Sequence, residues 1–380
     1  MNVEVGLVWD AVGDIAGGRG LLEVARGAGL DTFLVFDHLI NVFPRQAWDT
    51  GFSYQAEAMP TPDRCLDFAT VLGNFAPQAG PVRLAVGVTD PHRRHPAVLA
   101  QTALTLAQLT DRAPVLGIGA GAEENLAPYG VPRERKVSRV EEALQILRMF
   151  FGGEGPHDFR GEFFTLDQAL MGLPAPEGRT PRIWLGGNRD RMLRLAGRYA
   201  DGWLPSELMS PDAYARQLAV VRAAATAAGR DPDAIVPAGG VPVVVAETDA
   251  AAHALLRAAP LRFMALHAGA AAWRAHGAAH PFGDGYRGLA ELLPHRLTRA
   301  EVASAMAAVP DEIVAAQALV GSRETVLKRI RELLDAGMRH PMLIPASALA
   351  SPEAAGYTVE SVGWLAERLR TAAAPEGSAV

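Results

Sequence analysis

The feature that most constrains the fold is a repeated unit, in which a short apolar run precedes a segment with helical spacing of apolar residues. Near the N-terminus, the apolar run 3–9 precedes such a segment, Gly29 ends it, and a second apolar run follows at 32–36. Near the C-terminus, a helical pattern that stops at Gly337 precedes the apolar run 342–344. The two ends of the chain are therefore copies of one strand–helix unit.

The same unit recurs between these ends. The predicted strands are 3–9, 32–36, 82–88, 115–119, 183–185, 202–204, 241–246 and 342–344. Strands that alternate with helices pair in parallel, because each helix returns the chain to the same edge of the sheet. Eight such units in 380 residues predict a closed (β/α)8 barrel, the TIM barrel fold.

Two stretches interrupt the repeat. Residues 39–62 are a long loop after the second strand, and residues 250–310 are a mainly helical insertion before the last helix and strand. Long excursions from a compact domain are usually lids or binding loops. We predict a single barrel domain over residues 1–350, which includes both excursions, and a C-terminal extension over residues 351–380.

Composition narrows the class of protein. The formal charge of −6 and the pI near 6.0 argue against a nucleic-acid partner. Cys65 is the only cysteine, so an intrachain disulfide is excluded, and a free thiol fits a reducing compartment. The histidine pairs His92/His95 and His276/His280 lack further ligands, so no metal site is predicted. Without a recognisable leader or membrane span, we expect a cytoplasmic protein.

The carboxyl ends of the strands carry the catalytic candidates, because barrel enzymes place their chemistry there. The second strand ends in Asp37-His38, directly before the long loop. Histidine suits proton transfer near neutral pH, so His38 is the first candidate. The alternative is a histidine that anchors the loop, with Asp37 capping the turn through backbone amides.

Two glycine-rich turns suggest a bound ligand. Gly117-Ile-Gly-Ala-Gly-Ala122 formally fits the dinucleotide fingerprint, but it follows the fourth strand, and Glu123-Glu124 would repel a pyrophosphate. The other interpretation is a small-residue turn beside a flat ligand. Gly186-Gly187-Asn188-Arg189 opens a helix, and free amides there favour a phosphate. Surface arginines without a ligand are the alternative for that segment, although phosphate sites of barrels fall near the late strands.

Taken together, these segments resemble the luciferase-like flavin and deazaflavin oxidoreductases over about residues 3–350. The segments that carry the resemblance are Phe36–Leu39, Gly87–Pro96, Leu116–Gly121, Asn125, Pro128–Gly130, Arg139–Ala143, Pro181–Gly187 and Ala196–Trp203. Within that group, the chain is most similar to coenzyme F420-dependent reductases of the phthiodiolone ketoreductase-like and methylene-tetrahydromethanopterin reductase-like branches. Segments 273–281 and 292–294 point to the former.

The resemblance implies an F420-dependent oxidoreductase, in which hydride passes between a deazaflavin and a carbonyl, C=C or C=N carbon of a metabolite. It also implies a non-proline cis peptide at Gly87–Val88 behind the ring, with His38 as proton donor or acceptor. The residues it places at the cofactor are Asp37, His38, Gly87, Val88, Ala120, Gly121, Asn125, Gly186, Gly187, Asn188 and Arg189.

The chain departs from the resemblance at one catalytic position. Many deazaflavin members carry a glutamate directly after the glycine that is Gly121 here, whereas this chain has Ala122. Either Glu124 or Glu123 takes the acid role from a shifted turn, or His38 works without a carboxylate.

The substrate side is predicted only in outline. Phe43 and Trp48 are the candidates for the loop aromatic residue of the family, and Trp9 ends the first strand. All three are predicted to contact a small-molecule substrate, which the apolar insertion would allow to be hydrophobic. The alternatives are an FMN-dependent luciferase-like monooxygenase and a catalytically decayed barrel that only binds cofactor. A homodimer is expected by analogy with the family.

Overall fold

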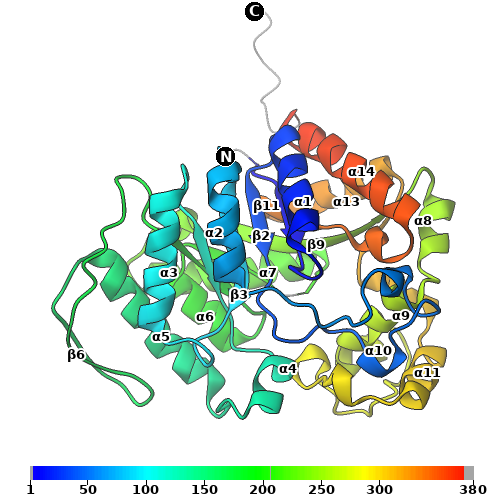
Figure 1. Cartoon of the computed structure of the whole chain (residues 1–380), viewed down its shortest axis with the longest axis horizontal. Coiled ribbons are helices and arrows are strands. Elements are labelled where there is room, and N and C mark those ends of the chain that lie inside the picture. The colour runs from blue at the N-terminus through cyan, green and yellow to red at the C-terminus, as the bar shows by residue number, and fades with distance from the viewer. Residues whose placement is uncertain (1–2, 206, 372–380) are drawn as a thin grey trace, which may run out of the picture.

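A computed structural model describes residues 3–205 and 207–371, and eight parallel strands in it close into a barrel (Figure 1). The strands are β1 (Gly6–Trp9), β2 (Thr32–Val35), β3 (Arg83–Thr89), β4 (Val115–Ile118), β7 (Arg182–Gly186), β8 (Gly202–Leu204), β9 (Val236–Val245) and β11 (His340–Ile344). Each strand pairs with the next, and β11 joins β9 to β1, so that the ring has no open edge. The predicted (β/α)8 barrel is confirmed.

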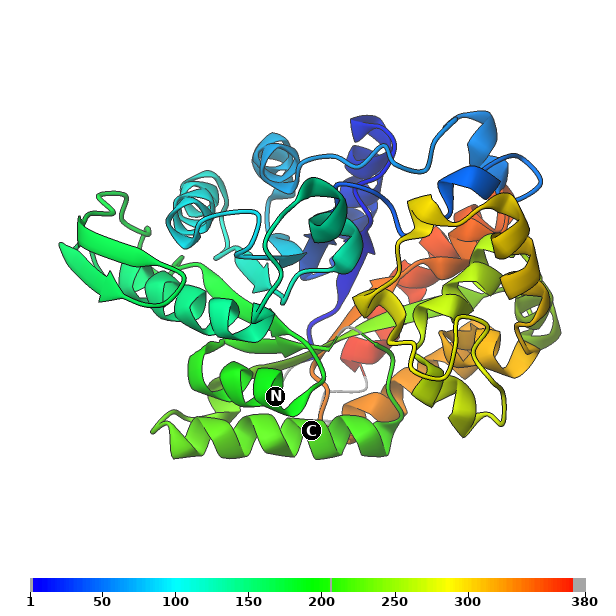
Figure 2. The ribbon, with the colours of Figure 1, turned by 90° about the horizontal axis from the view of Figure 1, so that it is seen from below.

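Helices surround the strands on the outside (Figures 1 and 2). They are α1 (Ile15–Gly27), α2 (Phe68–Ala79), α3 (Pro96–Leu109), α5 (Lys136–Gly152), α6 (Asp190–Tyr199), α7 (Pro211–Ala227), α13 (Arg323–Asp335) and α14 (Pro352–Thr371). Several begin at a side-chain cap that satisfies an unpaired amide, as when Asp14 accepts from Gly17 N and Ser322 from Thr325 N. No described helix combines the length and the apolar composition needed to cross a membrane.

Side chains along the strands alternate between two cores, because successive residues of a strand point to opposite faces. One residue from each strand fills the barrel interior: Val8, Leu34, Ala85, Val115, Trp184, Leu204, Ala238 and Met342. Their neighbours, such as Leu7 and Phe33, face the surrounding helices in the larger core. This alternation determines which residues reach the open end of the barrel.

The barrel extends beyond the predicted boundary at residue 350. Helix α14 follows the last strand and packs against α1 and α13, and it buries Val362, Leu365 and Leu369 completely or almost so. It is therefore the eighth helix of the barrel and belongs to the barrel domain. Residues 372–380 of the predicted extension lie outside the described residues.

Three strands outside the barrel ring were not predicted from the sequence. Strands β5 (His157–Arg160) and β6 (Thr165–Ala169) form an antiparallel hairpin between α5 and β7. Strand β10 (Leu319–Gly321) pairs with the carboxyl-terminal end of β9. These segments alternate too briefly or too irregularly to give a clear periodic signal.

The two predicted excursions, residues 39–62 and 250–310, form one unit that we call the cap. Its helices are α8 (Asp249–Leu255), α9 (Ala259–Met264), α10 (Ala270–Ala275), α11 (Arg299–Ala307) and the adjoining α12 (Asp311–Ala316). Phe43 and Phe52 of the loop contact Phe263 of α9, with ring centroids 6.4 and 6.1 Å apart. The cap therefore has a hydrophobic core of its own.

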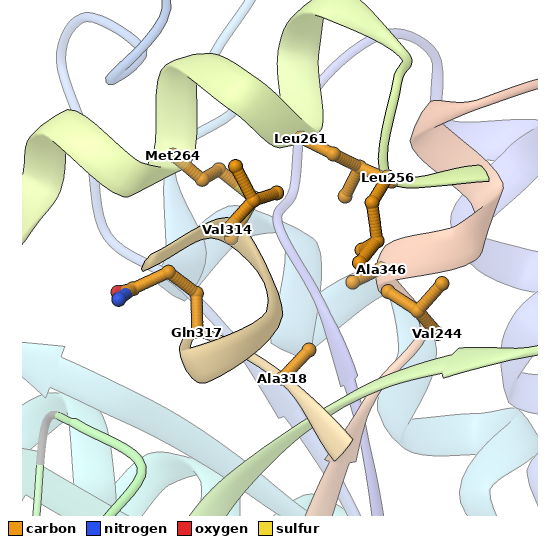
Figure 3. A pocket seen from close by; sticks show the side chains of 8 residues that line it. All are labelled: Val244, Leu256, Leu261, Met264, Val314, Gln317, Ala318 and Ala346. Carbon is orange, nitrogen blue, oxygen red and sulfur yellow. The ribbon is translucent and has the colours of Figure 1, made fainter. Parts of the chain in front are cut away.

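A small apolar cavity lies between the cap and the barrel. The apolar cavity in Figure 3 lies between α9, α12 and the end of β9, and it leaves only about 10 Å³ for the centre of a water-sized sphere. Gln317 supplies the polar side chain of its lining. Such a space holds at most about one water molecule, so it is a packing defect and has no room for a substrate.

A cluster of charges closes the opposite, amino-terminal end of the barrel. Glu4 accepts hydrogen bonds from Arg83 Nη1 at 2.8 Å and Arg112 Nη2 at 2.9 Å, and His340 Nδ1 lies 3.2 Å from its Oε2. Burial acts to raise the pKa of Glu4, but His340 and Arg83 outweigh it and hold that pKa well below its ordinary value. The ionised carboxylate is thus part of the folded structure.

We expect Glu4→Gln to lower the free energy of unfolding at pH 7 by roughly 2 kcal/mol, because Arg83 loses its buried charge partner. A carboxylate with a depressed pKa stabilises the fold above its unfolded pKa of about 4.3, and this contribution is lost as the pH falls. The gap between wild type and variant should therefore shrink below about pH 4 in urea titrations. Glu23→Gln on exposed α1 is the control, and equal stability of all three proteins would contradict the prediction.

Candidate active site

The alternation of side chains decides which strand-end residues face the open end of the barrel. Val8 points inward, so Trp9 points outward, and its ring lies 5.8 Å from that of Phe75 on α2. A side chain at Gly18 of α1 would collide with the same ring. This placement on the helix side of the sheet argues against the prediction that Trp9 contacts a substrate.

Asp37 is committed to an ionic network behind the second strand. Its Oδ2 accepts hydrogen bonds from Thr89 Oγ1 at 2.6 Å, Arg93 Nη2 at 2.8 Å and Arg94 Nη1 at 2.6 Å. Asp90 accepts from Arg93 Nε at 2.6 Å, so the whole turn after β3 is tied to the end of β2. The buried carboxylate of Asp37 thus fixes the backbone position of His38. Its partners Arg93 and Arg94, more than fifty positions away in sequence, were given no role from the sequence.

His38 faces the barrel interior and meets two residues from the turn after β4. Its Nδ1 lies 3.0 Å from Asn125 Nδ2 and 3.4 Å from Glu124 Oε1. Asn125 Oδ1 also accepts a hydrogen bond from Leu39 N at 2.7 Å. Asn125 and Glu124 are 2% and 1% exposed, while the His38 side chain stays 24% exposed. The histidine therefore reaches solvent from a buried polar support.

The two candidate glutamates are the first residues of the short helix α4 (Glu123–Leu126), and their side chains point in different directions. Successive helical residues point about 100° apart, so adjacent side chains leave in different directions. Glu123 turns outward and pairs with Arg133 Nη1 at 2.5 Å and Lys136 Nζ at 3.2 Å, which argues against it as the proton donor. Glu124 turns inward to His38, and its buried Oε2 has no hydrogen-bond partner among the described residues.

The peptide bond between Gly87 and Val88 is cis, as the family resemblance implied. Val88 fills the space that two glycines leave, Gly119 directly after β4 and Gly186 at the end of β7. A Cβ at Gly119 would lie 2.5 Å from Val88 Cγ2, and one at Gly186 would lie 3.0 Å from Val88 Cγ1. Strand packing therefore explains Gly119 of the glycine run. Ala120 and Gly121 are partly buried and lead directly into α4.

The predicted phosphate segment keeps an accessible helix start. Gly187 has a φ of 134° and is held through its carbonyl by Trp203 Nε1 at 3.0 Å. Asn188 follows, and Arg189 precedes α6 as an exposed residue whose side chain caps no amide. The other arginines of this helix match the surface alternative: Arg191 and Arg198 both pair with Glu141, and Arg194 lies near Asp190.

The loop aromatic residues lie inside the cap. Phe43 and Trp48 are 6% and 8% exposed, their ring centroids are 6.0 Å apart, and Trp48 Nε1 donates to Met59 O at 2.8 Å. Both side chains are used to hold the loop on the insertion. Their burial argues against the prediction that they contact a substrate directly.

Asp10 lies at the site but was not among the residues predicted from the sequence. The same alternation that turns Trp9 outward turns Asp10 inward. Solvent reaches its side chain from the open end of the barrel, but protein surrounds it otherwise. Burial raises the pKa of Asp10, while the Val12 amide and His38 act to lower it. Burial, Asp63 and Asp10 likewise raise the pKa of the free thiol of Cys65 to about 12, so this thiol is not a nucleophile at neutral pH.

This arrangement is a (β/α)8 barrel with a group of polar side chains, His38, Glu124 and Asn125, at the open strand ends. Family comparison agrees with it: the model of the luciferase-like monooxygenase family matches residues 10–340. The chain belongs to this family and is an oxidoreductase of the luciferase-like superfamily. In the described residues, no group of three or more histidine, cysteine or acidic side chains could hold a metal ion.

Two relatives are similar in sequence. A phthiodiolone/phenolphthiodiolone dimycocerosates ketoreductase of Mycobacterium sp. (strain JLS) is 38% identical over 84% of this chain and 85% of its own length. An F420-dependent hydroxymycolic acid dehydrogenase of Mycobacterium tuberculosis (strain ATCC 25618 / H37Rv) is 35% identical over 46% of this chain and 48% of its own length.

Two solved structures share the fold. The coenzyme F420-dependent tetrahydromethanopterin reductase of Methanopyrus kandleri has a TM-score of 0.74 at 19% identity, covering 96% of this chain and 98% of that one. A type II Baeyer–Villiger monooxygenase from Pseudomonas putida, in complex with FMN, has a TM-score of 0.67 at 20% identity, covering 98% and 99%. At these identities the likeness concerns the fold alone.

We expect Asp37→Asn to lower the free energy of unfolding by about 2–3 kcal/mol, because it leaves two buried guanidinium groups with one carboxylate fewer. Glu123→Gln is the matched control, because its carboxylate is 15% exposed and its partner Arg133 49%, against 2% for Asp37, so solvent weakens its ion pairs. Urea denaturation of both variants and the wild type would measure the difference. A loss in Glu123→Gln as large as in Asp37→Asn would contradict this assignment.

Asp10→Asn should have the opposite effect on stability. A carboxyl with a raised folded pKa destabilises the fold as the pH rises above its unfolded pKa of about 3.9, because ionisation is then disfavoured in the folded state. The variant should be more stable than wild type at pH 7, and the difference should vanish near pH 3. Thermal unfolding from pH 3 to pH 8 tests this, and a variant less stable than wild type at pH 7 would contradict it.

Proposed function

We propose that the protein is a coenzyme F420-dependent oxidoreductase, which transfers a hydride between the deazaflavin and a carbonyl carbon of a metabolite. The observation that carries the proposal is the group of His38, Glu124 and Asn125 at the open barrel end. The F420-dependent relative at 35% identity supports the choice of cofactor. The ketoreductase at 38% identity supports a carbonyl substrate rather than a C=C or C=N bond.

The residues at the open end suit a flat ring with one polar edge. Phe36, Val88 and Ile344 pack on the barrel interior and stay partly exposed there, which offers apolar contact to a ring face. His38, with a side chain that is 24% exposed, supplies a polar group beside them. The exposed amides before α6 suit the phosphate of the cofactor, with Arg189 beside them. When bound, the deazaflavin supplies or accepts the hydride.

His38 handles the proton that accompanies the hydride. In carbonyl reduction the carbon gains the hydride with its electron pair, and the oxygen gains a proton from His38, so that an alcohol forms. In the reverse direction the imidazole takes the alcohol proton. Solvent, which reaches the 24% exposed ring, returns the proton to His38 between turnovers. Asp37 acts only through position, because its carboxylate is held by the two arginines.

The substrate class and the assembly extend this proposal. The ketoreductase relative is named for phthiodiolone and phenolphthiodiolone dimycocerosates, and the apolar surface at the open end would suit a hydrophobic small molecule. A homodimer remains part of the proposal by analogy with the family.

The cofactor is tested by titrating the full-length protein with F420, FMN and NADPH in parallel. We expect saturable binding of F420, and oxidation of its reduced form that depends on an added ketone or aldehyde. Saturation with FMN alone would favour a luciferase-like monooxygenase instead. Binding of F420 without turnover of any carbonyl or alcohol would favour a barrel that has lost its catalytic activity.

His38→Gln tests the proton assignment. General acid catalysis typically contributes 10²–10⁴-fold, so kcat should fall by about 10²-fold or more, while the Kd for F420 stays within about threefold. His276→Gln is the control, because His276 is an exposed histidine of the cap. Wild-type turnover by His38→Gln would overturn the assignment.

A further inference from the structure

We infer that Asn125 is a positioning residue, which holds neutral His38 in the tautomer that carries its proton on Nε2. In that tautomer His38 presents a hydrogen-bond donor to the substrate, so the neutral site is suited to bind a carbonyl oxygen. The assignment of a carbonyl as the ligand rests on the proposed function, whereas the tautomer itself does not.

The orientation of the Asn125 amide is fixed by the backbone of the next strand end. Leu39 N lies 2.7 Å from Asn125 Oδ1, and a backbone amide can only donate. The oxygen of the side chain therefore faces Leu39, and the nitrogen faces the other way. Reversing the amide would set two donors against each other at this distance, in a side chain that is 2% exposed and has no room for a bridging water.

Both hydrogens of Asn125 Nδ2 then have an acceptor. His38 Nδ1 lies 3.0 Å from Nδ2 and Glu124 Oε1 lies 3.1 Å from it. An NH₂ group carries two donors and no acceptor, so Nδ1 must present its lone pair. A neutral imidazole with an unprotonated Nδ1 carries its proton on Nε2.

The rival arrangement is a protonated Nδ1 that donates to Glu124. It would point a ring N–H at the Asn125 amino group, which cannot accept it. The distance of 3.4 Å between Nδ1 and Glu124 Oε1 is also longer than a charge-assisted hydrogen bond of about 2.7–2.9 Å. Asn125 thus separates the ring from the carboxylate and bonds to both.

The fixed tautomer selects what the other ring nitrogen can do. Within the described residues Nε2–H of His38 donates to no protein acceptor, and the ring is the exposed member of the group. An N–H at this position donates to a carbonyl oxygen and polarises the carbonyl for hydride addition, which is the role of a neutral histidine as an electrophile. Taking a proton from an alcohol would require an unprotonated Nε2, and hence the loss of the Asn125 bond.

The tautomer can be measured in the full-length protein without cofactor. Histidine labelled with ¹⁵N gives long-range ¹H–¹⁵N spectra in which a protonated and an unprotonated ring nitrogen differ widely in shift. His38→Gln identifies the signals of His38 among the ten histidines of the chain. We expect Nδ1 of His38 to have the shift of an unprotonated nitrogen at pH 8, and a protonated Nδ1 there would overturn the inference.

Asn125→Asp is the variant that should switch the tautomer. Its carboxylate still accepts from Leu39 N but presents an oxygen to Nδ1, so Nδ1 should become protonated. We expect kcat for carbonyl reduction to fall about 10²-fold with KM within about threefold. Asn41→Asp is the matched control, because Asn41 is a buried asparagine of the loop that bonds to Pro62 O and not to His38.

Three outcomes separate the possibilities. A switched Nδ1 shift with reduced kcat supports the inference, and an unchanged shift in Asn125→Asp overturns it. Should Asn125→Asp fail to fold, Asn125→Ala removes the same donor, and an unmixed wild-type tautomer there would also overturn it. If the protein binds FMN rather than F420, the proposed function fails while the wild-type tautomer can still be observed, so the two failures are distinguishable.

Discussion

The structure depends on the alternation of side chains along eight short parallel strands. One buried residue from each strand fills the barrel interior. The next inward-facing residue, two positions further along the strand, therefore lies at the open end. Asp10, Phe36 and His38 lie at the open end for this reason. Trp9 and Asp37 point to the other face of the sheet, toward the helices. A shift of one residue in any of these strands would exchange the two sets.

Adjacent residues therefore take opposite roles at both sides of the site. Asp37 holds the turn after β3 through two arginines, while His38 faces the open end. Glu123 pairs with surface cations, while Glu124 supports His38. In the strand the separation comes from the period of two, and in α4 it comes from the helical turn. Glu124 thus reaches the histidine because it lies on the inner side of α4.

The sequence predicted the features that depend on periodicity or on a family motif: the eight strands, the excursions, the cis peptide and His38 at a strand end. It could also have excluded Trp9 and selected Asp10, had the alternation from Val8 been followed one step further. The fate of Phe43 and Trp48 could not be read in this way, because it depends on Phe263, which is more than two hundred positions away. Helix α14 was not predicted to be part of the barrel, although Val362, Leu365 and Leu369 form an apolar stripe at helical spacing.

The cap has a consequence for how the chain is made. Its loop lies near the N-terminus, but the partners of that loop come from the last third of the chain, and Tyr54 donates to Ala348 O at 2.8 Å. During synthesis Phe43, Trp48 and Phe52 therefore leave the ribosome long before Phe263 exists. These aromatic residues have no packing partners until the chain is almost complete, so the cap assembles last. The exposed aromatic surface of this loop is therefore where a nascent chain is most prone to aggregate.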